Sequence, residues 1–204
     1  MNVFAWIATV PYEEAGAKLK KLYDRIRAPS GEIDNIMSVH SLRPHTLNAH
    51  MALYKAALHH AANKLPTWLL ETVGVYVSLL NGCEYCVEHH FSGLKRLLND
   101  EARADAIRRA LEAEKPEQAF DEREVAALRY AAELTRAPAD LTEEALEPLR
   151  AAGFDDGEIL ELNQVTSYFA YANRTVLGLG VSLRGDTLGL SPGDSDDPEN
   201  WQHS

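Results

Sequence analysis

The chain has 204 residues, of which 46% are hydrophobic and 25% are charged, and its formal net charge is −11 at pH 7. This length suits one globular domain with a sizeable core, and the absence of an apolar run near the roughly 18 residues that span a bilayer excludes a membrane protein. The negative charge would repel nucleic-acid phosphates and anionic lipid, so we expect neither as a partner. The first residues lack a basic stretch before a short apolar segment, so we expect no secretory signal and a cytoplasmic protein.

Apolar residues recur at three- and four-residue spacing along most of the chain, which predicts helices. We expect a first helix over residues 12–27 and a second from Pro44 to about His60, because proline fits the first turn of a helix. A third helix begins after Pro66. It ends at Asn81-Gly82, since glycine readily adopts the left-handed conformation that closes a helix.

The second half of the chain continues this pattern. Residues 83–98 form the next expected helix, which places Cys83 near a helix amino terminus. Three further helices have a side chain able to cap their first turn: Asp100, Asp121 and Thr142. The last expected helix starts near Asp155-Asp156.

No stretch alternates as a strand would, so the predicted fold class is all-α. We expect one helical domain over residues 1–190. Residues 191–204 are rich in Pro, Gly, Ser and acidic residues. They are predicted to form a flexible acidic tail without a chemical role.

The only two cysteines, Cys83 and Cys86, lie three residues apart. Successive residues on a helix advance by about 100°, so both cysteines share a face with His90. Free N–H groups at a helix amino terminus stabilise a thiolate and lower a thiol pKa from its usual value of about 8.5. A disulfide at this spacing closes almost no loop and contributes little stability. Redox chemistry therefore explains the pair better than a structural crosslink.

Glu71 lies in the otherwise apolar run LLETVGVYV, twelve residues before Cys83. A buried carboxylate is unfavourable without a partner. If the helices on either side of Asn81-Gly82 fold against each other, Glu71 meets the face that carries the cysteines and His90. It would then act as a base or orient the imidazole of His90, which can relay protons near neutral pH.

Other interpretations stay open for these residues. The cysteines could be inert buried thiols, or they could bind zinc together with His89 or His90, although one helix rarely supplies four ligands. His89 points about 100° away from His90, so we expect it on the surface or at an interface. Tyr85 is expected to pack or to form a pocket wall. Solvated or core roles are expected for the other histidines of this half: His40, His45, His50, His59 and His60.

The pattern E-x11-C-x2-C-x3-H, formed by Glu71, Cys83, Cys86 and His90, resembles the alkylhydroperoxidase AhpD-like branch of the carboxymuconolactone decarboxylase family. The segments SLRPHTLNAHMALYKAALHH and YANRTVLGLGV resemble its peroxidase-related subgroup, and together the similarity covers most of residues 10–182. The resemblance implies an AhpD-like multi-helix fold and a homo-oligomer such as a dimer, trimer or hexamer. It also implies peroxide reduction without metal, haem or another cofactor.

The resemblance also implies the roles of the motif residues. Cys86 would attack the hydroperoxide and Cys83, the more accessible thiol, would resolve the sulfenic acid into a disulfide, although the two roles could be reversed. Glu71 and His90 would relay protons, and a lipoylated or thioredoxin-like dithiol protein would reduce the disulfide. Peroxidase members have a histidine where this chain has Tyr85, which places the efficiency of proton transfer in question. The alternative function is a redox-sensing or disulfide-exchange protein without peroxidase turnover.

Overall fold

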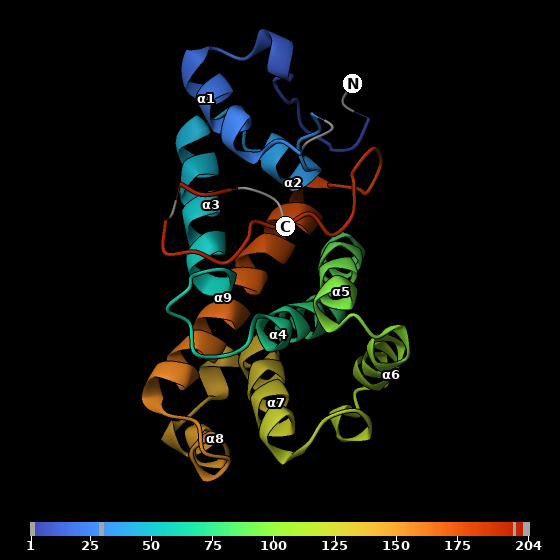
Figure 1. The fold of residues 1–204 in the computed structure, drawn as a ribbon, viewed down its shortest axis with the longest axis vertical. Helices are drawn as coiled ribbons and strands as arrows, with labels where there is room; N and C mark the ends of the chain where they lie inside the picture. The colour runs from blue at the N-terminus through green and yellow to red at the C-terminus, as the bar shows by residue number, and fades with distance from the viewer. Residues whose placement is uncertain (1–2, 29–30, 198, 202–204) are drawn as a thin grey trace.

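The computed structural model describes residues 3–28, 31–197 and 199–201, and the regular elements of this part of the chain are helical (Figure 1). This confirms the all-α prediction. The α-helices are α1 (Ala17–Ile26), α2 (Asn35–Ser38), α3 (Pro44–Leu58), α4 (Thr67–Leu80), α5 (Glu84–Leu98), α6 (Glu101–Glu112), α7 (Glu122–Arg136), α8 (Glu147–Ala151) and α9 (Asp156–Leu179). Short 3-10 helices lie at Tyr12–Glu14, Pro116–Gln118, Pro138–Asp140 and Glu143–Leu146.

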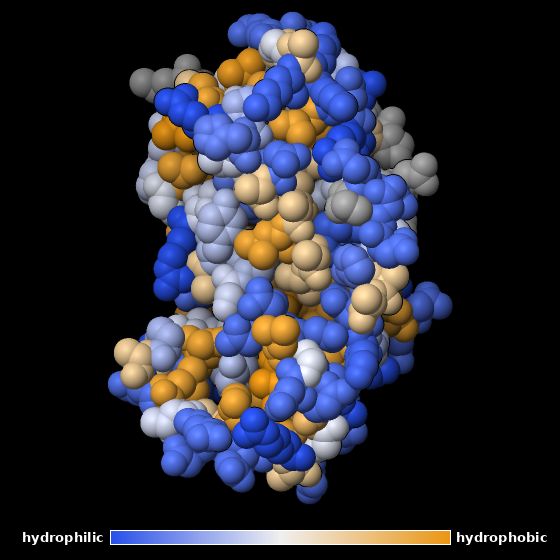
Figure 2. Space-filling view, turned by 90° about the vertical axis from the view of Figure 1, so that its left-hand side faces the viewer, coloured by the Kyte–Doolittle hydropathy of each residue, from blue (hydrophilic) through white to orange (hydrophobic). Residues whose placement is uncertain are grey.

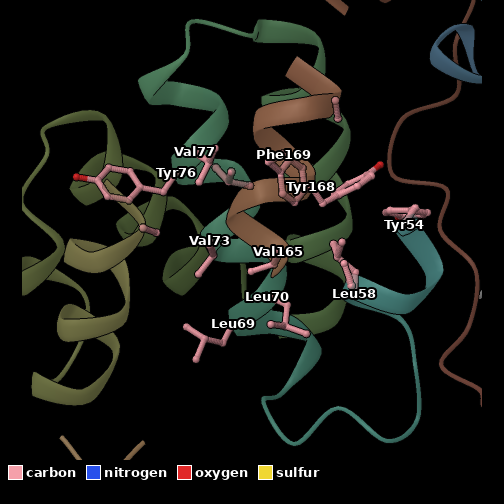
Figure 3. Packing of buried hydrophobic residues seen from close by; sticks show 14 of the residues in the cluster. Tyr54, Leu58, Leu69, Leu70, Val73, Tyr76, Val77, Val165, Tyr168 and Phe169 are labelled. Carbon is pink, nitrogen blue, oxygen red and sulfur yellow. The ribbon is translucent and has the colours of Figure 1, made fainter. Parts of the chain in front are cut away.

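Helix α4 forms the centre of the core and packs against α5, α7 and α9. Every residue from Leu69 to Ser78 is buried, as expected of a helix surrounded by other helices. Helix α9 approaches closely because Gly74 has no side chain: a Cβ atom there would lie 2.1 Å from the ring of Phe169. Figure 3 shows Phe169 and Val165 of α9 next to the side chains of α4.

The helix boundaries agree with the sequence signals where these signals act locally. Gly82 follows α4 with a φ of 66°. Asp100, Asp121 and Asp155 accept hydrogen bonds from backbone N–H groups in the first turns of α6, α7 and α9. These three caps and the stop after α4 confirm the predicted boundaries.

Two predicted helices differ from the structure. The helix expected over residues 12–27 is divided, because Ala15 and Gly16 adopt extended backbone with ψ values of 128° and 161°. Thr142 does not cap a backbone group; its hydroxyl donates to the carboxylate of Glu144, and the chain forms a 3-10 turn before α8.

The C-terminal segment, here defined as residues 189–201, lies along the domain. The sequence predicts a flexible tail from residue 191, but the described residues run beside α3 (Figure 1). Trp201 is buried, and its ring lies 5.8 Å from that of Tyr54 between centroids. The ammonium of Lys55 donates to the carbonyl of Gly193, and Arg96 donates to Ser191. Residue 198 and residues 202–204 of the predicted tail lie outside the described residues.

The surface is mixed in character. Figure 2 shows the face beside α3: hydrophilic residues cover most of it, and hydrophobic residues gather toward the end of the molecule that carries α8. Within the described ranges, no helix combines the length and the hydrophobicity that a membrane span needs.

Candidate active site

The two cysteines lie where α4 ends and α5 begins. The left-handed backbone of Gly82 reverses the chain, and the N–H of Cys83 donates to the carbonyl of Ser78 at 2.9 Å. Both thiols are free, and their Sγ atoms are 3.2 Å apart. Cys83 is 0% exposed and Cys86 is 2% exposed, so both thiols are buried.

The hydrogen bond between the thiols makes them titrate as a pair. The Cys86 thiol lowers the pKa of Cys83 below its ordinary value, although burial acts against this. The same contact with Cys83, together with burial, raises the pKa of Cys86 well above its ordinary value. The buried Asn173 of α9 stabilises the anionic form of both sulfurs, and its side chain is fixed by hydrogen bonds with Asn81 and Ser78. One sulfur of the pair is therefore the favoured place for a negative charge.

Glu71 and His90 form a buried hydrogen bond. Glu71 is 2% exposed, and its Oε2 atom accepts from Nδ1 of His90 at 2.7 Å. Burial alone would raise the pKa of this carboxyl, but His90 and His59 outweigh burial and lower it to about 2. Glu71 is thus a carboxylate, and a neutral His90 that donates from Nδ1 has Nε2 free to accept a proton.

A second imidazole lies on the other oxygen of this carboxylate. Nε2 of His59 is 3.5 Å from Oε1 of Glu71 and 3.1 Å from the hydroxyl of Tyr54. Its Nδ1 lies 3.1 Å from Oδ1 of Asp194 in the C-terminal segment. Burial lowers the pKa of His59, but the bonds with Asp194 and Glu71 outweigh burial and raise it. His59 therefore belongs to the site, beyond the solvated or core role that the sequence suggested.

Two carboxylates, Asp186 and Asp34, lie near Tyr85. Its hydroxyl donates to Oδ2 of Asp186 at 2.5 Å and accepts the backbone N–H of Ile36 at 3.1 Å. His89 lies 3.2 Å from the same oxygen and is 8% exposed, so it does not lie on the open surface, which was one of its two predicted places. Burial raises the pKa of nearby Asp34 to about 7, against the opposing effect of His89.

The pair of Glu71 and His90 lines one cavity of about 50 Å³ together with Tyr85, His89 and Asp34. Cys86, Glu71 and His90 are part of its wall, and so are Tyr85 and Trp201, whereas Cys83 is not. The predicted role of Tyr85 as a pocket-wall residue is confirmed. A single water needs about 10–15 Å³, so this volume admits about four water-sized molecules.

Sequence reasoning found the motif residues but missed several partners. The missed side chains act on the site from other parts of the chain: Asp34, His59, Asn173, Asp186 and Asp194. A weak signal existed for His59, which lies beside another histidine at the end of the predicted second helix. Asp194 had none, because it stands among other acidic residues in a segment with the composition of a disordered tail.

The zinc alternative requires a set of converging ligands. No group of three or more His, Cys, Asp or Glu side chains among residues 3–28, 31–197 and 199–201 could hold a metal ion.

Comparison with known proteins adds to this geometry. Residues 44–133, from the start of α3 into α7, match the model of the carboxymuconolactone decarboxylase family. This stretch contains both cysteines, Glu71 and His90. No curated protein is significantly similar to the chain in sequence.

Solved structures share the fold over most of the chain. A peroxidase-related protein of Ralstonia eutropha JMP134, described as an alkylhydroperoxidase AhpD core, is 21% identical with a TM-score of 0.77, over 89% of this chain and 93% of that one. A peroxidase-related protein of Silicibacter sp. TM1040 is 24% identical with a TM-score of 0.77, over 89% and 92%. The apo debrominase Bmp8 is 19% identical with a TM-score of 0.69, over 91% and 94%. These similarities confirm the predicted AhpD-like helical fold, and residues 44–133 within it match the carboxymuconolactone decarboxylase family.

Proposed function

We propose that the protein is a thiol peroxidase that reduces a small hydroperoxide through Cys83 and Cys86. The observation that carries this proposal is that one cavity contains Cys86 together with His90, whose Nδ1 donates to the buried Glu71 carboxylate at 2.7 Å. A thiol nucleophile needs a base nearby and a third group that orients the base. Cys86, His90 and Glu71 have the residue types and the arrangement for these three roles.

The reaction runs in two steps. The Cys86 thiolate attacks one oxygen of the hydroperoxide, so that an S–O bond forms, the O–O bond breaks and the departing alkoxide takes a proton to become an alcohol. The Cys83 sulfur then attacks the resulting sulfenic acid, an S–S bond forms, and hydroxide leaves as water after protonation. Two thiols are oxidised and one hydroperoxide is reduced. His90 holds the proton that Cys86 releases and returns it to a leaving oxygen.

Cys86 is the proposed attacking residue because it lines the cavity and Cys83 does not. The pKa of Cys83 is lowered and that of Cys86 is raised, so Cys83 is the first thiol of the pair to ionise and Cys86 keeps its proton longer. Loss of that proton to His90 as the peroxide arrives activates Cys86. Cys83 is then 3.2 Å away and ready to resolve the sulfenic acid.

The size of the cavity favours a small substrate. A volume of about 50 Å³ suits hydrogen peroxide or a short alkyl hydroperoxide.

The proposed reductant is a dithiol protein of the lipoylated or thioredoxin-like kind. Such a partner suits the reducing cytoplasm, where we place the protein. Both cysteines are at most 2% exposed, so exchange with a partner protein requires movement of a cavity wall.

We also propose that the protein forms a homo-oligomer. Large apolar side chains are exposed, including Trp6 at 78% and Leu160 at 58%, and hydrophobic residues gather near the α8 end of the face in Figure 2. A gathering of exposed apolar residues on one face is typical of an interaction site. Sedimentation equilibrium measures the state directly, and a monomer at micromolar concentration would contradict this part of the proposal.

The test compares the wild type with Cys83→Ser and Cys86→Ser during hydrogen peroxide consumption with dithiothreitol as reductant. We expect many turnovers by the wild type and none by Cys86→Ser. After removal of dithiothreitol, one equivalent of hydrogen peroxide should leave Cys83→Ser with a sulfenic acid on Cys86 that dimedone traps for mass spectrometry. Consumption that stops after one equivalent would instead indicate the redox-sensing alternative. Unreactive thiols, or full activity in Cys86→Ser, would contradict the peroxidase.

A further inference from the structure

A line of polar contacts leads from the cavity to the C-terminal segment. Nδ1 of His90 is 2.7 Å from one oxygen of Glu71, and the other oxygen of Glu71 is 3.5 Å from Nε2 of His59. Nδ1 of His59 is 3.1 Å from Asp194. The exposed fraction of the side chains rises from 2% at Glu71 and 3% at His59 to 49% at Asp194. A half-exposed carboxylate is thus connected to the buried relay.

The position of Asp194 is fixed from several directions. Its Oδ2 atom accepts from the hydroxyl of Thr67 at 2.7 Å. The preceding carbonyl accepts from the buried ammonium of Lys55, and the N–H of Ser195 donates to the carbonyl of His59 at 3.1 Å. Both α3 and α4 therefore hold this carboxylate against the imidazole of His59.

We propose that Asp194 and His59 are positioning residues of the active site. Asp194 holds His59 as an imidazolium with both ring N–H groups engaged, and His59 holds Glu71 as the carboxylate that accepts the Nδ1 proton of His90. This inference rests on the proposed peroxidase function, because it assigns both residues to the same proton relay. It makes the C-terminal segment part of the catalytic apparatus.

The electrostatics agree with this geometry. An imidazolium that is 3% exposed is unfavourable unless opposite charges lie close to it, and here Asp194 and Glu71 flank it. Without Asp194, burial dominates and His59 loses its proton near neutral pH. Glu71 then loses one of the two partners that keep it ionised, so burial raises its pKa. A Glu71 that is less fully ionised accepts the Nδ1 proton of His90 less well, so the proton of Cys86 becomes harder to remove.

Few other titratable groups face this line. The hydroxyl of Tyr54 contacts His59, and Tyr168 lies near Glu71; burial raises the pKa of both phenols well above 10, so they stay neutral between pH 5 and 9. Lys55 acts on Asp194 as a positive charge. Asp34 on the cavity wall also titrates in this range, because burial raises its pKa to about 7. A pH dependence between pH 5 and 9 therefore belongs to the imidazoles, the thiols and Asp34, and a comparison of matched variants isolates the part that comes from His59.

The experiment measures single-turnover oxidation of the thiols by hydrogen peroxide between pH 5 and 9 in Asp194→Asn and in Asp196→Asn. The control removes the same charge from an exposed residue two positions along the segment. We expect the rate of Asp194→Asn at pH 7 to fall about tenfold and its pH midpoint to rise by about one unit. Asp196→Asn should match the wild type, and Asp194→Glu should recover most of the rate.

A second measurement separates this inference from the proposed function. The ¹⁵N signals of the His59 ring should be those of an imidazolium at pH 7 in the wild type and of a neutral ring in Asp194→Asn. Equal signals and equal pH profiles in Asp194→Asn and Asp196→Asn would overturn the inference, while rapid oxidation of the wild type would still support a peroxidase. If the wild-type thiols do not react, the proposed function fails, and the ¹⁵N signals alone decide the positioning role.

Discussion

Glu71 shows how a single charged residue is stabilised inside a helical core. It is 2% exposed, and two imidazoles contact its two oxygens at 2.7 and 3.5 Å. Breaking a buried pair by removing one member leaves an uncompensated charge. This charge arrangement should therefore be visible in the pH dependence of stability.

The pKa of Glu71 is lowered from 4.5 to about 2, against the effect of burial, by His90 and His59. Its ionisation therefore contributes about 3 kcal/mol to the free energy of unfolding, which is present above pH 4.5 and is lost as the pH falls toward 2. The pKa of His59 is raised, so its protonation also stabilises the folded protein, but this stabilisation is present at low pH and is lost as the pH rises through the folded pKa. We expect Glu71→Gln to flatten the loss of stability between pH 4.5 and 2 in urea titrations.

Glu133→Gln is the matched control for this experiment, because Glu133 is an exposed glutamate within α7. It should keep the wild-type pH dependence. An equal acid-induced loss of stability in Glu71→Gln and the wild type would show that Glu71 is not held as a carboxylate by the imidazoles.

At the scale of residues, spacing revealed one half of the site. Glu71 lies on α4, Cys86 and His90 lie on α5, and Cys83 directly precedes α5. Helix geometry and one turn at Gly82 are therefore enough to bring them together. The second oxygen of Glu71 faces His59, which contacts Asp194, and these neighbours are brought together only by tertiary contacts. Asp194 meets His59 across 135 positions of the chain, and no local pattern indicates such a pairing.

The contact between α4 and α9 depends on one missing side chain. A Cβ atom at Gly74 would lie 2.1 Å from the ring of Phe169, whereas one at Gly178 of α9 would meet nothing within 4 Å. Gly74→Ala should therefore destabilise the protein by about 2 kcal/mol through overpacking. Gly178→Ala should stabilise it by up to about 1 kcal/mol, because alanine is the better helix former. Urea unfolding monitored by circular dichroism measures both changes. Equal stability of the two variants would contradict the close approach of the helices.

At the scale of elements, the sequence predicted those helix boundaries that are set by residues close together in the chain. The aspartate caps and the glycine after α4 act within one turn, so α6, α7 and α9 begin where expected. Residues 12–27 carry helical periodicity throughout, yet Ala15 and Gly16 are extended. Tertiary packing can override a weak local preference, particularly at a glycine, which is costly within a helix.

At the scale of the whole molecule, the C-terminal segment is the main departure from expectation. Its composition is that of a disordered tail, but composition does not reveal which side chains of the helical domain bind the segment. Lys55, His59 and Thr67 bond to Gly193 and Asp194, and Trp201 fills space beside Tyr54. The segment thereby supplies part of the wall of the cavity.

This arrangement predicts that Trp201 limits the size of the substrate. Trp201 lines the cavity and is 5% exposed, so a smaller side chain there enlarges the space beside Cys86. In Trp201→Leu we expect the rate of thiol oxidation by cumene hydroperoxide, relative to that by hydrogen peroxide, to rise about tenfold, since pocket fit discriminates by factors of this order. Both rates are measured by stopped flow as the loss of free thiols, because tryptophan fluorescence itself changes in these variants.

The control for this prediction is Trp68→Leu. Trp68 lies on α4, packs against the core and stacks on Arg103, and it does not line the cavity. Both variants lose one tryptophan and some packing, so a general loosening of the protein would change the two ratios alike. A rise confined to Trp201→Leu would show that the C-terminal segment sets the size of the cavity. An unchanged ratio in Trp201→Leu would mean that large peroxides reach Cys86 by another route, and that the segment contributes to the site through Asp194 alone.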